Sequence, residues 1–199
     1  GASVGNTTAS DNDVNGGTVV DASGSNGTDI SGTDLSGNNM TDSTGVDVSG
    51  SEGTNVSDTT ASGNDISGGK VVDASNSTGS DVSGTDMSGN NMTGSTGVDV
   101  SGSSGTNVSD TTASGNDITG GAVVDASNST GADVSGTDLS GNNMTGSTGV
   151  DVSGSEGASV ANTTASDNDI SGGKVVDASG SNGTDVSGTD LSGNNMTDS

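Results

Sequence analysis

Carboxylates are the side chains with the most potential for chemistry in this chain. It has 27 acidic residues against two lysines, Lys70 and Lys174, so its formal net charge is −25. It has no histidine and no cysteine, which removes the usual ligands of zinc and the groups that most often activate or act as a nucleophile. No lysine is positioned to activate one of the many serines and threonines. We therefore predict that the protein is not an enzyme.

One aspartate recurs every 26 residues, between two small apolar residues. If successive copies stack at the ~4.8 Å spacing of β-strands, neighbouring carboxylates repel by roughly 0.9 kcal/mol even in water. A divalent cation would offset this repulsion, since carboxylate oxygens are the ligands that Ca²⁺ prefers. The alternative is a solvated face that keeps the protein soluble. The full set is Asp21, Asp47, Asp73, Asp99, Asp125, Asp151 and Asp177, and the candidate ligands within it are Asp47, Asp73, Asp99, Asp125 and Asp151.

A second candidate site resembles the start of a calcium-binding loop. Asp11, Asp13 and Asn15 are followed by glycine, and Asp167 and Asp169 begin a looser copy. Such loops usually supply a glutamate at their twelfth position, and neither copy has one. No cofactor is required by these residues, and Ca²⁺ is the candidate ligand.

The strong negative charge restricts the possible partners. Nucleic acids and anionic lipid head groups carry the same sign and would be repelled, so we expect neither as a partner. No apolar run is long enough to span a membrane. Cations and further copies of the same repeat are the partners that the sequence favours.

The apolar content is too low for an ordinary globular core. Leu, Ile, Val and Phe account for 29 of 199 residues, and there are no aromatic residues. Such a composition is typical of disordered chains. A stacked solenoid can nevertheless order it, because each coil buries its apolar residues against its neighbours.

The chain is built from nested repeats. The sequence T-T-A-S recurs every 52 residues from Thr7, and each 52-residue unit divides into two related halves of 26. A longer period of 156 also exists, since residues 1–43 and 157–199 are identical at 38 of 43 positions. Such periods predict a repeat architecture.

The apolar positions within each half-unit exclude a helix. Their spacings are 5, 5, 8 and 8, whereas a helix needs spacings of three and four, and the 37 glycines would destabilise helices. Two coil lengths are compatible with the spacings. A 13-residue coil would stack Ala61 on Ala74, but the remaining apolar positions keep only the 26-residue register, which we prefer.

The local motif resembles that of the pentapeptide-repeat family. It consists of a small or polar residue, Asp or Asn, an apolar residue, Ser or Thr, and usually Gly, as in S-D-V-S-G, T-D-M-S-G and N-N-M-T-G between residues 80 and 94. The resemblance implies a right-handed, four-sided β-helix with the apolar residue inside. This chain departs from the family by using Val, Ala, Met and Ile at the centre, and by inserting triplets such as S-T-G, which would widen corners or lengthen faces.

The prediction is therefore an all-β fold, a parallel β-solenoid with about 26 residues per coil and 52- and 156-residue higher-order repeats. Residues 1–199 would form a single continuous segment without caps, a fragment of a longer array. The recurring aspartate would point outward between two inward columns. These columns are Val20, Val46, Val72, Val98, Val124, Val150 and Val176, and Ala22, Val48, Ala74, Val100, Ala126, Val152 and Ala178.

The function expected from these features is structural. We predict an extracellular or cell-surface stalk, fibre or filament, as in an adhesin or matrix protein. Two alternatives remain at this point. One is an ice-binding solenoid, although the outward residues are Asp or Asn with Ser or Thr rather than paired threonines. The other, implied only by the family resemblance, is an acidic rod that mimics DNA and occupies a DNA-binding enzyme.

Overall fold

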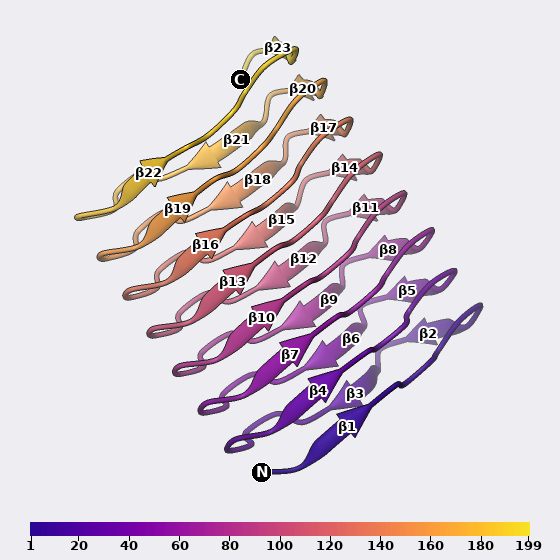
Figure 1. The fold of residues 1–199 in the computed structure, drawn as a ribbon. Helices are drawn as coiled ribbons and strands as arrows, with labels where there is room; N and C mark the ends of the chain where they lie inside the picture. Colours follow the sequence, from indigo (N-terminus) through magenta and orange to yellow (C-terminus); the bar gives the residue numbers. More distant parts are fainter.

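The computed structural model describes all 199 residues as β-strands, bends and turns wound into about eight stacked coils (Figure 1). It contains no helix that is long and apolar enough to cross a membrane. Paired residues of neighbouring strands lie 26 positions apart, so that Val72 lies between Val46 and Val98. The 26-residue parallel β-solenoid is confirmed, and the 13-residue coil is excluded.

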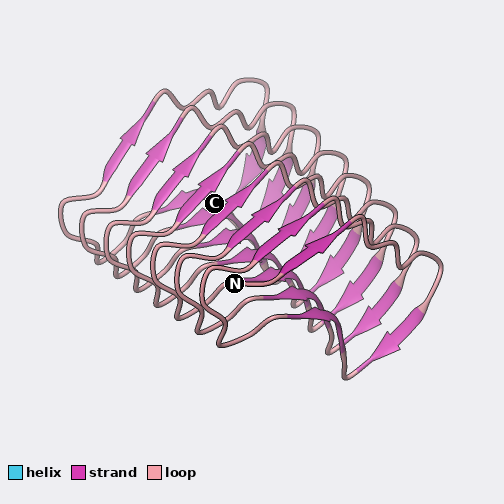
Figure 2. Ribbon diagram, turned by 60° about the horizontal axis from the view of Figure 1, so that its bottom comes forward, coloured by secondary structure: helices cyan, strands magenta, loops and turns pink.

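Three parallel sheets run along the rod (Figure 2). Sheet 1 consists of β1 (Ser3–Gly5), β4 (Asp29–Ser31), β7 (Asn55–Ser57), β10 (Asp81–Ser83), β13 (Asn107–Ser109), β16 (Asp133–Ser135), β19 (Ser159–Ala161) and β22 (Asp185–Ser187). Sheet 2 consists of β2 (Asp13–Asn15), β5 (Asn39–Thr41), β8 (Asp65–Ser67), β11 (Asn91–Thr93), β14 (Asp117–Thr119), β17 (Asn143–Thr145), β20 (Asp169–Ser171) and β23 (Asn195–Thr197). Sheet 3 consists of β3 (Thr18–Asp21), β6 (Thr44–Asp47), β9 (Lys70–Asp73), β12 (Thr96–Asp99), β15 (Ala122–Asp125), β18 (Thr148–Asp151) and β21 (Lys174–Asp177).

Two single-residue ladders continue the pairing between the sheets. One passes through Thr60 and Asp86, and the other through Thr78 and Ser104. Each coil therefore pairs with its neighbours at five places. The backbone hydrogen bonds that link coils are short, such as that from the Ala74 amide to the Asp99 carbonyl at 2.7 Å. Because parallel strands need long connections, the rest of each coil serves as the connection between successive strands of one sheet.

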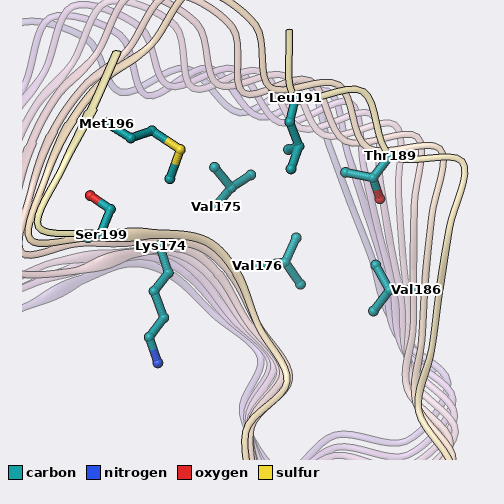
Figure 3. Close-up of a pocket in the computed structure, with 9 residues that line it drawn as sticks. Lys174, Val175, Val176, Val186, Thr189, Leu191, Met196 and Ser199 are labelled. Atoms are coloured by element: carbon teal, nitrogen blue, oxygen red, sulfur yellow. The ribbon is translucent and has the colours of Figure 1, made fainter. Parts of the chain in front are cut away.

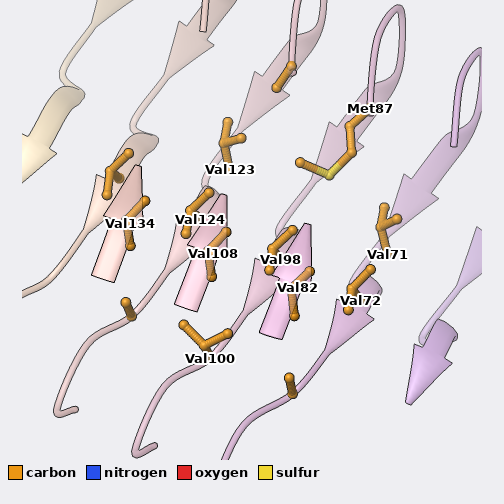
Figure 4. Close-up of a cluster of buried hydrophobic side chains, with 14 of the residues drawn as sticks. Val71, Val72, Val82, Met87, Val98, Val100, Val108, Val123, Val124 and Val134 are labelled. Atoms are coloured by element: carbon orange, nitrogen blue, oxygen red, sulfur yellow. The ribbon is translucent and has the colours of Figure 1, made fainter. Parts of the chain in front are cut away.

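A narrow apolar core fills the rod from end to end. It contains 34 buried residues, including the valines of sheets 1 and 3 that face each other in Figure 4. Val72, Val98 and Val100 are fully buried, as predicted for the two inward columns. Asp73, which lies between Val72 and Ala74, points outward and is half-buried.

Positive backbone φ angles at the corners explain the frequent glycines. Gly84 has a φ of 61°, and the corresponding corners one coil before and after are Asp58 (φ 54°) and Asp110 (φ 53°). Glycine adopts this region without steric cost, and Asp and Asn tolerate it better than other residues. The corners therefore alternate between two residue types without a change of geometry.

Two packing arrangements alternate from coil to coil and account for the 52-residue period. Where a large residue such as Met87 enters the core, sheet 3 has a glycine at position 97. A Cβ atom on Gly97 would lie 2.6 Å from the Met87 Sδ. One coil earlier, the small Ala61 stands at the position of Met87, and Val71 stands at the position of Gly97. Two coils are thus the smallest unit that fills the interior evenly.

The first inserted triplet of each coil bends sheet 3. It covers residues 69–71 in one coil, and the strand pairs through Lys70, Val72 and Asp73 while Val71 is skipped. Both consecutive valines are buried, so the strand turns between them. Figure 3 shows the same turn in the last coil, where Val175 and Val176 both point into the interior and Lys174 points away from it. The expected alternation of inward and outward side chains along β9 holds only from Val72 onward.

Candidate functional site: an acidic groove along sheet 3

The outside of the bend in sheet 3 forms a groove along the rod. In its central part it holds a hollow of about 330 Å³. The strands of three successive coils contribute Thr96, Ala122 and Thr148 to it, together with Asp125 and Asp151. Corner glycines complete the lining, at positions 94, 120, 121 and 146. The groove therefore presents carboxylates on a floor of small residues.

The aspartates of the groove are held in one orientation. Each accepts a hydrogen bond on Oδ1 from the backbone amide of the serine two residues later, at 3.0 Å for Asp73, 2.8 Å for Asp99, 2.9 Å for Asp125 and 2.8 Å for Asp151. This local bond is typical of aspartate in turns. It does not involve Oδ2 of the carboxylate.

A lysine ammonium occupies the groove in one coil. The Nζ of Lys70 lies 2.7 Å from Asp73 Oδ2 and 2.6 Å from Asp99 Oδ2, which belong to successive coils. Burial alone would raise the pKa of Asp73, but hydrogen bonds from Lys70 and Ser75 outweigh it and hold that pKa below its ordinary value. Burial would likewise lower the pKa of Lys70, and the two carboxylates raise it instead. The ammonium and the Asp73 carboxylate are therefore charged at neutral pH.

The equivalent place two coils later has no cation of its own. Ala122 stands where Lys70 stands, and Asp125 and Asp151 correspond to Asp73 and Asp99. Burial raises the pKa of Asp125, against the hydrogen bonds from Ser127, and the nearby charges of Asp99 and Asp151 raise it further. Residues of the same column thus shift in opposite directions because one coil has a lysine and the other an alanine.

The last lysine repeats the first arrangement. Lys174, again two coils further on, donates to Asp177 Oδ2 at 2.5 Å. The bond from Lys174 is the main cause of a lowered pKa of Asp177. Lysine therefore occupies two of the four equivalent positions, 70 and 174, while position 18 is threonine and position 122 is alanine.

The calcium-loop candidates lie elsewhere and are spread along the chain. Asp13 and Asn15 point outward from β2, on either side of Val14, while Asp11 occupies a corner with a φ of 57°. Asp167 is a corner with a φ of 58°, and Asp169 begins β20. No three acidic side chains converge on one point in the molecule. Calcium binding at these residues, and at Asp47, Asp73, Asp99, Asp125 and Asp151, stays a prediction.

Sequence reasoning found the aspartate column but missed the lysines and the bend. The lysines were considered only as isolated charges, although each precedes its column aspartate by three residues. The inserted triplet that carries them was assigned to a wider corner or a longer face. A comparison of positions 18, 70, 122 and 174 at the 52-residue period would have identified the variable position of the groove.

The similarity of this chain to known proteins is distant. No known family matches the chain, and no curated protein matches it. Among solved structures, the periplasmic alginate epimerase AlgG is 13% identical with a TM-score of 0.44, over 86% of this chain and 61% of that one. The chain therefore spans less than two thirds of that structure.

Two further structures match nearly the whole of this chain. QnrB1, a plasmid-mediated fluoroquinolone resistance protein, is 18% identical with a TM-score of 0.37, over 100% of this chain and 90% of its own. HetL is a pentapeptide repeat protein involved in heterocyst differentiation regulation in the cyanobacterium Nostoc sp.; it is 15% identical with a TM-score of 0.25, over 98% of this chain and 91% of its own. The chain is a parallel β-solenoid repeat protein, structurally similar to pentapeptide-repeat and other β-helix proteins.

Proposed function

We propose that this protein is an extracellular structural repeat, which acts as a stalk, fibre or filament segment. One observation carries the proposal: all three sheets keep a 26-residue register through every coil, without a break or a shift. Pairing of this kind depends only on the neighbouring coils, so it can continue for any number of repeats. The number of repeats in the sequence then determines the length of the rod.

The surface supports this role. The net charge of −25 keeps rods apart in solution, and only two lysines offer cleavage sites to trypsin-like proteases. Both features suit a protein exposed outside the cell. In this proposal the protein is not an enzyme, and it attaches to further copies of its own repeat.

The proposal is tested by changing the number of repeats. Chains with one, two and three 156-residue units should form rods that lengthen by roughly 29 Å per unit, since six coils are added at about 4.8 Å each. Small-angle scattering measures the length, and electron microscopy of the native material should show thin, uniform rods. A particle that becomes rounder as units are added would overturn the proposal.

The same chains separate the two alternatives. Thermal hysteresis in a freezing assay would indicate ice binding. Inhibition of a DNA-binding enzyme at low salt would indicate a DNA mimic. The structural proposal expects neither activity to grow with the number of units.

A further inference from the structure

We infer that the groove beside Ala122 binds a primary ammonium group, supplied by a small alkylamine or by a lysine side chain of a partner. Asp125 and Asp151 both line the hollow beside Ala122. This inference goes beyond the structural role proposed above and does not depend on it. It rests on a comparison between coils of the same molecule.

The repeat itself displays the ligand at the equivalent site. Two coils before Ala122, the ammonium of Lys70 is held by two carboxylates of successive coils at 2.6 and 2.7 Å. These are the short distances of charge-assisted hydrogen bonds. The Lys70 side chain is only 30% exposed, so its alkyl stem also packs along the groove. A cation with an alkyl stem is therefore the group for which this geometry is suited.

The acceptors persist at position 122 although the cation is absent from the chain. Asp125 and Asp151 each use Oδ1 to accept the amide of a following serine, as Asp73 and Asp99 do. Strand pairing places Asp125 directly beside Asp151. No side chain donates to their Oδ2 atoms, so the two acceptors that hold Lys70 in one coil are unoccupied in the other.

The space for the ligand is also present. Replacing lysine by alanine removes the stem and the ammonium, and the hollow of about 330 Å³ lies over Ala122 with Thr96 and Thr148 on either side. Ala122 itself is buried, with an exposed fraction of 9%. An alkylamine can thus enter from solvent and lie where the lysine side chain lies in the other coil.

An ammonium group suits this site better than a metal ion. Calcium takes six to eight oxygen ligands, and no three acidic side chains converge here. An ammonium has three N–H donors, and two carboxylates of adjacent coils satisfy two of them at the Lys70 site. Burial, and after it the charges of Asp99 and Asp151, raise the pKa of Asp125, and a bound cation would offset the repulsion between these carboxylates.

The test is a titration of the full 199-residue chain with n-butylammonium chloride, at neutral pH and constant ionic strength. Side-chain carboxyl ¹³C NMR shifts report each aspartate. We expect saturable shifts at Asp125 and Asp151, with little change at Asp73. A lysine-containing pentapeptide of otherwise glycine residues forms a second arm, and a tighter response to it than to butylammonium would identify a protein partner as the source.

Two controls distinguish this site from general screening and from metal binding. Tetramethylammonium has the same charge but no N–H donor, so it should give no saturable shift. Equal shifts along the whole aspartate column would overturn the inference. Equal responses to butylammonium and tetramethylammonium would overturn it too. A saturable response to CaCl₂ without one to butylammonium would also overturn it, in favour of a metal site.

Matched variants place the binding at position 122. Ala122→Lys should supply the ammonium from within the chain and abolish the response to butylammonium, while raising Tm as the ion pairs form. Ala122→Met fills the groove with a stem of similar length but no charge, and should block binding without that gain in Tm. Asp151→Asn should weaken butylammonium binding about tenfold, the effect of losing one charged acceptor of about 1.4 kcal/mol. Unchanged binding in Ala122→Lys would contradict the assigned position.

Discussion

Negative charges are arranged differently on the outer faces of sheets 1 and 2 than on the outer face of sheet 3. On sheets 1 and 2, aspartate alternates with asparagine from coil to coil over most of the rod, and the asparagine donates to the aspartate before it. Asn107 donates to Asp81 at 3.1 Å and Asn91 to Asp65 at 3.3 Å. On sheet 3 the column is aspartate in all seven strands. Like charges in the first case lie two coils apart, and in the second only one.

The difference follows from the inserted triplet. It bends sheet 3 and adds a position beside the aspartates, occupied by Lys70 or Lys174 in two of the coils. The strands of sheets 1 and 2 have no such position. On these sheets the carboxylates are separated by asparagines within the column. Uninterrupted carboxylates are therefore found only where the backbone provides room for a cation beside them.

The largest expected effect concerns the bend that creates the groove. Gly97→Val should lower the free energy of unfolding by about 2–3 kcal/mol, because its side chain would meet Met87 and the Val123 carbonyl. Urea denaturation measures the loss. The double variant Met87→Ala with Gly97→Val imitates the pair found at Ala61 and Val71, so it should lose less than the sum of the two single losses.

Strict additivity of the two substitutions would show that the alternation of large and small residues is not coupled across the core. Val108→Ala in sheet 1 is the control for a buried truncation without a partner of this kind. Its loss should be the same whether or not Met87 is replaced.

The next effect concerns the cation in the groove. Lys70→Met keeps the stem but leaves Asp73 and the 94% buried Asp99 without their ammonium. We expect a loss of about 1 kcal/mol at low salt, intermediate between exposed and fully buried ion pairs. Thermal unfolding at two salt concentrations measures it. A Tm equal to that of the parent at low salt would contradict a stabilising role for this lysine.

A smaller effect tests the alternating face. Asn91→Asp in sheet 2 would place three carboxylates on successive coils, at positions 65, 91 and 117. We expect a loss of roughly 0.5–1 kcal/mol at low ionic strength, which shrinks as salt screens the charges. Asn91→Ser is the control, since it removes the amide donor without adding charge. If both variants lost the same stability at low salt, the alternation of aspartate and asparagine would not serve to separate charges.

The smallest effect is a change of stability with pH at Asp125. Its pKa is raised in the folded protein by burial and by Asp99 and Asp151, so the folded state binds the proton more tightly than the unfolded state does. The stability of the folded state therefore falls as pH rises from the unfolded pKa of Asp125 through its folded pKa. The full loss of stability is present above the folded pKa. Asp125→Asn should raise Tm slightly at pH 7 and leave it unchanged at pH 3.

The corresponding change at Asp73 should have the opposite sign. Its pKa is lowered, because Lys70 and Ser75 outweigh burial, so its contribution is present above the unfolded pKa and is lost as pH falls through the folded one. Asp73→Asn should lower Tm at pH 7. Equal effects of the two substitutions would contradict the assignment of the cation to one coil.

The coil length and the inward columns could be predicted from the sequence because they depend on spacing alone. Val72 stacks on Val46 and Val98 because any other register would place apolar residues outside. The bend could not be predicted in the same way. Val71 and Val72 are adjacent, and strand alternation expects one of them to face solvent.

The candidate site was predicted only in part for a related reason. The aspartate column follows from the period, but its partner does not, because position 70 varies between Lys, Ala and Thr in other coils. A variable position is not part of the common motif, so only a comparison of equivalent positions reveals it. Its importance depends on the bend, which brings the Lys70 ammonium within 2.6 Å of an aspartate of the next coil.

Aspartates of one column differ because one pair holds a lysine and the other does not. The most direct test is the pKa of Asp73 and of Asp125, measured together by carboxyl ¹³C NMR in the amine-free protein. The structure predicts that Asp73 titrates below the ordinary aspartate value of 3.8 and Asp125 above it. If the two aspartates titrated together, or in the reverse order, the groove would not distinguish its coils and the account would be contradicted.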